Sequence, residues 1–104
     1  MQSPSSIAQR KFDPGRVVIT PAASDLIERG QLDPIPFLSR HLCGDWGDMS
    51  SHESRENNKA LVRQNHMGNE LFSSYDNGGE AAPRIWVITE ADRSRTTLML
   101  ITDF

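Results

Sequence analysis

Residues 41–53 contain six side chains whose chemistry suits acid–base, nucleophilic or metal-binding roles. They are His41, Cys43, Asp45, Asp48, His52 and Glu53. A zinc site built from them would lack the paired cysteines and the histidine spacing of sulfur-rich sites, because the chain has a single cysteine. The acidic residues do not match the spacing of a calcium-binding loop. We therefore expect no metal in this stretch, and no cofactor, since nucleotide-binding glycine motifs are also missing.

Two catalytic hypotheses use the same stretch. In the first, the Cys43 thiol is the nucleophile and His41 or His52 is its base, which requires the two side chains to meet in space. A lone cysteine at the apolar end of a helix, however, usually behaves as a small buried hydrophobe. The second hypothesis is a small hydrolase or ribonuclease that uses four polar side chains for acid–base chemistry. They are His41, Asp45, Glu90 and Arg93.

The structural interpretation of this stretch needs fewer coincidences, and we favour it. Gly44 is suited to the left-handed conformation that ends a helix, and Gly47 permits a second sharp bend. Trp46 would fill the space between helices, with its indole N–H bonded to a carbonyl or carboxylate. The two aspartates of the stretch are expected to accept backbone N–H bonds. The predicted structural corner comprises Gly44, Asp45, Trp46, Gly47 and Asp48.

Start and stop signals predict three helices around this corner. Two of them begin with a capping residue followed by proline, at Thr20-Pro21 and Asp33-Pro34. In the second, Ile35, Leu38 and Leu42 are expected to face the core. The third begins with a capping box between Ser50 and Glu53. The predicted ranges are 21–29, 34–42 and 51–66.

The rest of the chain has the periodicity of strands. β-branched residues predict a short strand at 16–20, and residues 70–75, 84–90 and 95–102 predict an antiparallel meander joined by tight turns. Residues 84–90 have almost no polar alternation, which predicts a central strand covered on both faces. The predicted fold class is α+β: a small antiparallel β-meander of three to four strands, with about three helices packed on one face.

Length and composition indicate one domain. A chain of 104 residues with 37% hydrophobic residues is long enough to bury a single core. Residues 1–15 are rich in serine, proline and charge without periodicity, which predicts a flexible N-terminal arm before a globular domain at 16–104. No apolar segment approaches the length of a membrane span and no secretory signal is visible. We therefore expect a cytoplasmic protein that does not bind membranes.

Two polar surfaces are candidates for binding a partner: the exposed face of the third predicted helix and the turn between the last two strands. Their residues are Glu53, Glu56, Lys59, Arg63, Asp92, Arg93 and Arg95. The formal net charge of −3, with both signs mixed along the chain, disfavours direct binding of nucleic acid. A protein partner with a basic surface fits this charge better. An exposed edge strand would also be compatible with a homodimer.

Three segments resemble a family of small proteins from bacterial plasmids and other mobile elements. They are HLCGDWGD at 41–48, SSY at 73–75 and IWVITEADRSRTTLML at 85–100. The resemblance extends over about residues 16–100. Some members of this family are labelled as restriction-modification subunits, but a chain of 104 residues is too short for a methyltransferase domain. The resemblance implies an accessory protein of a mobile element.

Small acidic proteins in that setting often inhibit host defence by binding without catalysis. The leading hypothesis is therefore a non-enzymatic binding protein that inhibits a host defence complex of the CRISPR or restriction kind through protein–protein contact. The hydrolase described above is the alternative. An accessory module of transcription or of a toxin–antitoxin system is a third hypothesis.

Overall fold

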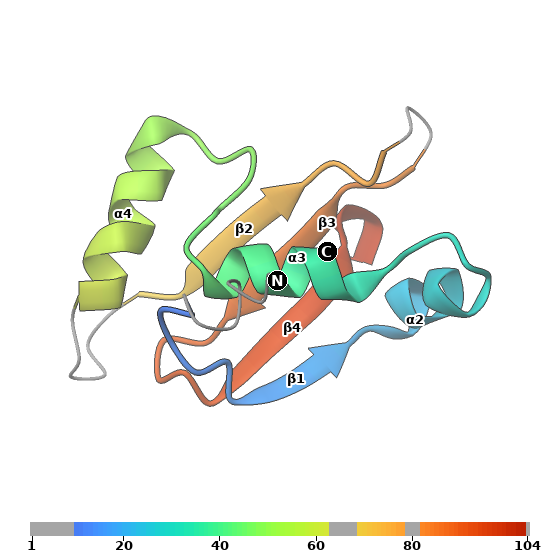
Figure 1. Cartoon of the computed structure of the whole chain (residues 1–104), viewed down its shortest axis with the longest axis horizontal. Coiled ribbons are helices and arrows are strands. Elements are labelled where there is room, and N and C mark those ends of the chain that lie inside the picture. Colours follow the sequence, from blue (N-terminus) through green and yellow to red (C-terminus); the bar gives the residue numbers. More distant parts are fainter. Residues whose placement is uncertain (1–9, 63–68, 79–81, 104) are drawn as a thin grey trace, which may run out of the picture.

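A four-stranded sheet flanked by helices forms the described part of the chain (Figure 1). The computed structural model describes residues 10–62, 69–78 and 82–103. Along the chain the elements are β1 (Arg16–Ile19), α2 (Pro21–Glu28), α3 (Pro34–Leu42), α4 (Ser51–Val62), β2 (Leu71–Tyr75), β3 (Ile85–Thr89), β4 (Arg95–Leu100) and the 3-10 turn η1 (Ile101–Asp103). The predicted α+β class is confirmed.

The strands lie in the order β1-β4-β3-β2. β2, β3 and β4 form the predicted antiparallel meander, in which Val87 pairs with Ser73 on one side and Leu98 on the other. β1 pairs with β4 in parallel, so the sheet is mixed, and the expectation of a purely antiparallel sheet was wrong in this respect. A parallel pair needs a long connection, and all three described helices together with β2 and β3 supply it here.

The helices begin at the capping residues that the sequence predicts. Thr20 and Asp33 cap α2 and α3 with their side-chain oxygens. At the start of α4, the Ser50 hydroxyl accepts the backbone N–H of Glu53, and the Glu53 carboxylate accepts that of Ser50, both at 3.1 Å. These bonds satisfy N–H groups that have no partner inside the helix, which is why local sequence alone locates the starts. The end of the third predicted helix, residues 63–66, lies outside the described residues.

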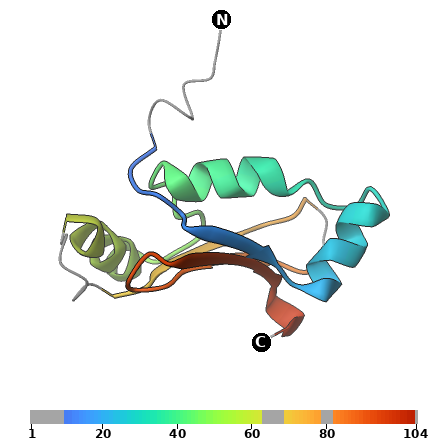
Figure 2. The same cartoon turned by 90° about the horizontal axis from the view of Figure 1, so that it is seen from below.

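The core lies between one face of the sheet and the helices α2 and α3, and α4 stands beside the edge strand β2 (Figure 2). A second, smaller apolar cluster forms around Trp46, Ala60 and Leu71. The buried apolar residues of the main core are Ala23, Leu32, Tyr75, Ile85, Val87, Leu98 and Leu100.

Two local predictions were wrong. Ile35 is 64% exposed, because the core-facing side of α3 is formed by residues 37, 38 and 41 and position 35 points about a third of a turn away from them. The predicted N-terminal arm does not extend to residue 15. The Lys11 N–H donates to the Leu42 carbonyl at 2.7 Å, Phe12 packs on the smaller cluster and Pro14 is buried. Residues 1–9 of that arm lie outside the described residues.

Candidate functional site

The glycine-hinged corner after α3 lies along the outer edge of β2. The Trp46 carbonyl accepts the Ser74 N–H at 3.1 Å, and the Asp48 N–H donates to the Ser74 carbonyl at 2.8 Å. Gly47 sits between them at φ +74°, and a Cβ there would lie 2.1 Å from the Ser74 carbonyl oxygen. The buried Trp46 indole donates to the side-chain carbonyl oxygen of Asn58 at 3.1 Å, which confirms the predicted carbonyl acceptor. The corner therefore joins α3, β2 and α4.

Asp45 is held within this corner by an ion pair. Its carboxylate accepts two hydrogen bonds from the Arg40 guanidinium, at 2.8 and 3.3 Å, and one from the Gly47 N–H at 3.2 Å. The Arg40 bonds are the main cause that lowers the pKa of Asp45. The Asp45 carbonyl accepts the Tyr75 hydroxyl at 2.7 Å. A carboxylate stabilised in its ionised form in this way is a poor proton carrier near neutral pH.

His41 is fully buried at the centre of a series of hydrogen-bonded polar side chains that runs across the strands on the core face of the sheet. Its Nδ1 lies 2.6 Å from the Ser73 hydroxyl and its Nε2 lies 2.9 Å from the Thr89 hydroxyl. The Thr89 hydroxyl is 2.7 Å from that of Thr96, which donates to the Pro14 carbonyl at 2.8 Å. Both imidazole nitrogens therefore have protein partners.

The Pro14 carbonyl fixes the direction of the hydrogen bonds from Thr96 to His41 Nε2, because a carbonyl accepts and never donates. Thr96 uses its single hydroxyl hydrogen on Pro14, so Thr89 must donate to Thr96 and receive the Nε2–H of His41. In the neutral imidazole Nδ1 of His41 then carries no proton and accepts from Ser73. Burial lowers the pKa of His41 to about 3, which agrees with this neutral tautomer. His41 thus ties α3 to three strands of the sheet and to the segment before β1.

The four residues of the hydrolase hypothesis are not assembled into one site. His41 is enclosed, whereas Asp45 is bonded at the exposed corner. Glu90 follows β3 and forms an ion pair of 3.3 Å with Arg95. All four of these residues, Arg93 included, lie in the described part of the chain, and no hydrogen bond or ion pair joins the side chains of any two of them. This geometry does not provide a matched acid and base.

Arg93, predicted both as a catalytic and as a partner-binding residue, is engaged inside the molecule. Its guanidinium donates to the carbonyls of Asn69, Glu90, Ala91 and Ala60 at 2.9–3.2 Å. The residue has a φ of +62°, and burial lowers the pKa of its side chain. Arg93 therefore fastens the last turn of α4 to the connection between β3 and β4.

The other predicted partner-binding residues lie on two separate elements. On α4, Glu56 is half-buried and pairs with the exposed Lys59 at 3.3 Å, and Glu53 is exposed. Asp92 and Arg95 are exposed at the turn before β4. Arg63 lies outside the described residues.

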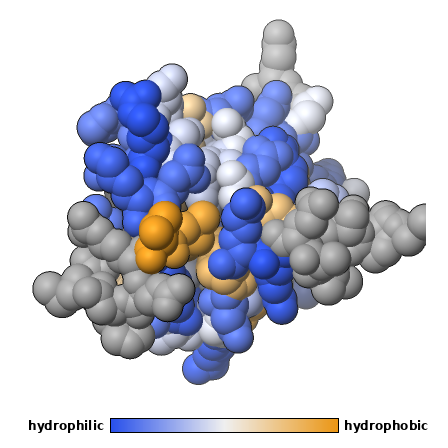
Figure 3. Space-filling model, turned by 60° about the vertical axis from the view of Figure 1, so that its left-hand side comes forward, coloured by the Kyte–Doolittle hydropathy of each residue, from blue (hydrophilic) through white to orange (hydrophobic). Residues whose placement is uncertain are grey.

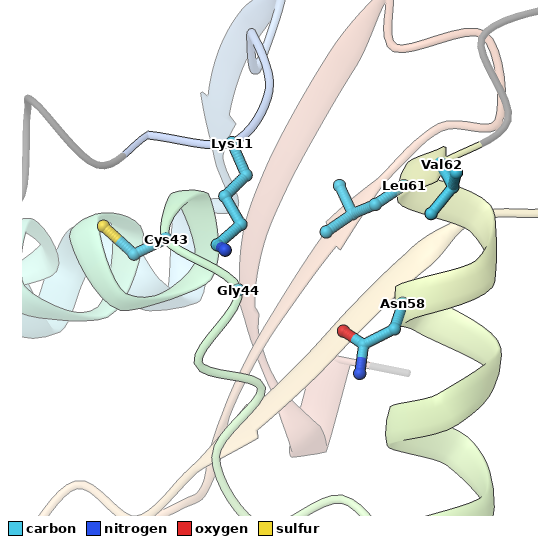
Figure 4. Close-up of a pocket in the computed structure, with 6 residues that line it drawn as sticks. All are labelled: Lys11, Cys43, Gly44, Asn58, Leu61 and Val62. Carbon is cyan, nitrogen blue, oxygen red and sulfur yellow. The ribbon is translucent and has the colours of Figure 1, made fainter.

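A cavity of about 480 Å³ lies between the end of α3 and α4. Figure 4 shows Asn58 and Leu61 reaching from α4 toward this space, whereas the Cys43 thiol points away from it. Both His41 nitrogens are occupied by hydroxyl groups, so they do not activate this thiol. Figure 3 shows a hydrophobic patch bordered by hydrophilic residues on the side of the molecule that carries α4, where Val62 is 77% exposed.

The face of the sheet opposite α3 has a centre of half-buried, mainly apolar side chains. Phe72 and Trp86 pack edge to face on it, with ring centroids 4.9 Å apart. Within the described residues no helix covers the middle of this face (Figure 2), so the prediction that β3 is covered on both faces was wrong. An unbroken apolar run does not distinguish a covered second face from an exposed apolar one. The half-buried centre of this side of the sheet is formed by Val18, Phe72, Trp86, Ile88, Thr97 and Met99, which we call the open face, and the strand register also places Arg16, Ser74 and Arg95 on this side.

A groove of about 290 Å³ separates α4 from β2 at the border of the open face. Its lining residues on the α4 side recur at intervals of three and four, so they share one side of the helix. At its base, the Asn57 amide donates to the Phe72 carbonyl at 2.8 Å and accepts the Phe72 N–H at 3.2 Å. The groove is lined by Met49, His52, Glu53, Glu56, Asn57 and Phe72.

Comparison with known proteins assigns no further role: no protein-family model, curated protein or solved structure matches the chain. Within the described ranges, no group of three or more His, Cys, Asp or Glu side chains is arranged to hold a metal ion. None of the helices in this part of the chain is long and apolar enough to cross a bilayer. The open face and the adjoining groove are therefore the strongest candidate functional surface.

Proposed function

We propose that the chain is a non-enzymatic protein-binding module that uses the open face of its sheet. The observation that carries this proposal is the set of large apolar side chains on that face, which includes Phe72, Trp86, Ile88 and Met99. Contiguous exposed apolar patches on folded domains mark interaction surfaces, and tryptophan, phenylalanine and methionine are enriched at their centres. The partner would bury this surface.

The edge of β2 supports docking on the face in preference to strand addition. Asn57 satisfies both backbone groups of Phe72, and the corner satisfies both backbone groups of Ser74. The outward-facing N–H and C=O groups of β2 at these two residues are therefore occupied, which removes the usual template for pairing with another strand. A partner at this end of the sheet would contact side chains.

The polar chain through His41 supports the same proposal. It links α3 to the sheet through hydrogen bonds that engage both His41 nitrogens, and such networks rigidify a domain when every member is satisfied. A rigid scaffold loses little conformational entropy when its surface is occupied.

For the biological role, we infer an inhibitor of a bacterial host defence complex of the CRISPR or restriction kind, acting in the cytoplasm. The basis is the resemblance of residues 41–48 and 85–100 to mobile-element proteins, together with the acidic balance of the chain. Acidic residues that compete for a nucleic-acid-binding surface would inhibit such a complex without catalysis.

Affinity capture with the full chain from a bacterial lysate that contains such a complex tests this function. The expected result is a stoichiometric protein partner whose nuclease activity falls when the purified chain is added. The double variant Ile88→Gln/Met99→Gln should neither capture this partner nor lower its nuclease activity. Recovery of no partner, or equal recovery by the double variant, would contradict the proposal.

A further inference from the structure

We propose that the groove between α4 and β2 binds an arginine or lysine side chain from a basic segment of the protein partner. This inference rests on the proposed function, because it names the chemistry that the partner presents at the border of the open face. Phe72 belongs both to the groove and to the open face, so one partner can occupy the two together.

The charge of the groove favours a cation. Glu53 and Glu56 line it, and His52 is the one basic side chain among its described lining residues. The Ser50 backbone N–H and hydroxyl lower the pKa of Glu53, so this carboxylate is ionised at neutral pH. One oxygen of Glu53 bonds Ser50 and one oxygen of Glu56 pairs with Lys59. The second oxygen of Glu56 makes no hydrogen bond or ion pair within the described residues and is available to a donor, and Glu53 adds a second carboxylate to the groove.

The apolar part of the groove suits the stem of a long basic side chain. Met49 and Phe72 provide apolar surface on its two sides. Lysine and arginine bury their methylene groups on such surface while the charged head reaches a carboxylate. The Asn57 amide at the base already bonds both backbone groups of Phe72, so it does not compete for the incoming donor. A volume of about 290 Å³ accommodates one such side chain.

The same charges disfavour other occupants. The carboxylates of Glu53 and Glu56 would repel a phosphate backbone or an acidic peptide, and like-charge contacts oppose binding. A basic segment that normally holds nucleic acid is the complementary surface. Binding there would place the chain in direct competition with nucleic acid.

Amide NMR titration of the full ¹⁵N-labelled chain tests the inference with synthetic probes. The first probe is a short peptide of leucine, tryptophan and arginine. In the matched probe, glutamine replaces each arginine. The arginine peptide should shift the amides of Met49, Asn57 and Phe72, and the glutamine peptide should bind at least about fivefold more weakly, as expected for the loss of two exposed ion pairs.

The double variant Glu53→Gln/Glu56→Gln should bind the arginine peptide more weakly than the wild-type chain does, by a similar factor. Glutamine at position 53 preserves the capping box, so α4 is retained. Glu28→Gln removes an exposed carboxylate from α2 and serves as the matched control, with unchanged affinity. Equal binding of both peptides, no binding, or shifts confined to residues outside the groove would overturn the inference. If Glu53→Gln/Glu56→Gln still captures a partner that Ile88→Gln/Met99→Gln no longer captures, the groove inference fails while the proposed function stands.

Discussion

The Nε2–H of His41 on α3 donates a hydrogen bond to the hydroxyl of Thr89 in the sheet, with 2.9 Å between Nε2 and Oγ1, and both residues are buried. This bond is one link in a chain that ends at the Pro14 carbonyl, 82 residues away in sequence from Thr96, the residue that donates to it. Because each hydroxyl has one hydrogen, loss of any member leaves a buried polar group without a partner. His41 therefore has a structural role: it holds α3 against the sheet.

Replacement of Thr89 by valine should destabilise the fold by about 2 kcal/mol, because the variant keeps the side-chain shape but leaves the His41 Nε2–H without an acceptor. Thr97→Val is the matched control. Thr97 is on the open face and its side chain makes no hydrogen bond to the described residues, so its replacement should change the free energy of unfolding by about 0.5 kcal/mol or less. Urea unfolding monitored by tryptophan fluorescence measures both. Equal losses of unfolding free energy in the two variants would contradict the role of the hydrogen-bond network through His41.

Acid should weaken the fold through His41. The pKa of this residue is about 3 in the folded chain and 6.5 when exposed, because burial disfavours the imidazolium. Below pH 6.5 the unfolded chain takes up a proton that the folded chain refuses, so stability falls as pH falls, by up to about 1.4 kcal/mol per pH unit. Between pH 7.5 and pH 5 the expected loss is about 2 kcal/mol.

The control for this pH effect is His41→Gln, which removes the titrating group. Its free energy of unfolding should be lower at pH 7.5 and should change little down to pH 5. That range stays above the pKa of Asp45, which Arg40 lowers, and above that of Glu53, which Ser50 lowers. Parallel pH profiles for the two proteins would show that another group is responsible.

Gly47→Ala should be among the most destabilising single changes, with a loss of at least about 3 kcal/mol. A Cβ at this position meets the Ser74 carbonyl at 2.1 Å and the Tyr75 ring at 2.6 Å, in addition to the strain of a positive φ. Gly30→Ala isolates the strain, since Gly30 has a φ of +75° and open space around it. This control should lose only about 1–2 kcal/mol. Thermal unfolding of both variants measures the difference, and similar losses would exclude the steric contact as the cause.

Arg93→Asn should loosen the end of α4. Asparagine tolerates the positive φ at this position, so the variant mainly removes the guanidinium that bonds four carbonyls. The expected result is a loss of about 2 kcal/mol and faster amide exchange in the last turn of α4. Hydrogen exchange followed by mass spectrometry measures this directly. Unchanged exchange around Ala60 would contradict the fastening role.

Local sequence predicts the features that local bonds create. The capping box of Ser50 and Glu53 satisfies groups three residues apart, so its signal is complete within the segment. Gly44 and Gly47 both take positive φ at the corner, as the need for a sharp bend implies. The parallel pairing of β1 with β4 has no local signal, because it depends on where the intervening chain returns.

The buried network and the open face were harder to predict for different reasons. His41 falls on the core-facing side of α3, but its partners Ser73 and Thr89 come from strands 32 and 48 residues away. Hydroxyl residues on those strands carry no sequence signal that they meet a histidine. For the open face, the apolar run around Trp86 and Ile88 indicated burial, and only the arrangement of the helices reveals that one side is open.

The affinity of the captured partner for the open face tests the central claim most directly. Isothermal titration calorimetry would compare the wild-type chain with Ile88→Gln/Met99→Gln and with Ile35→Gln, which makes the same type of change on the exposed side of α3. We predict that the double variant binds about 10- to 100-fold more weakly, as expected when two central apolar contacts are lost, and that Ile35→Gln binds as the wild type does. Equal affinities for all three proteins, with each of them folded, would contradict the account.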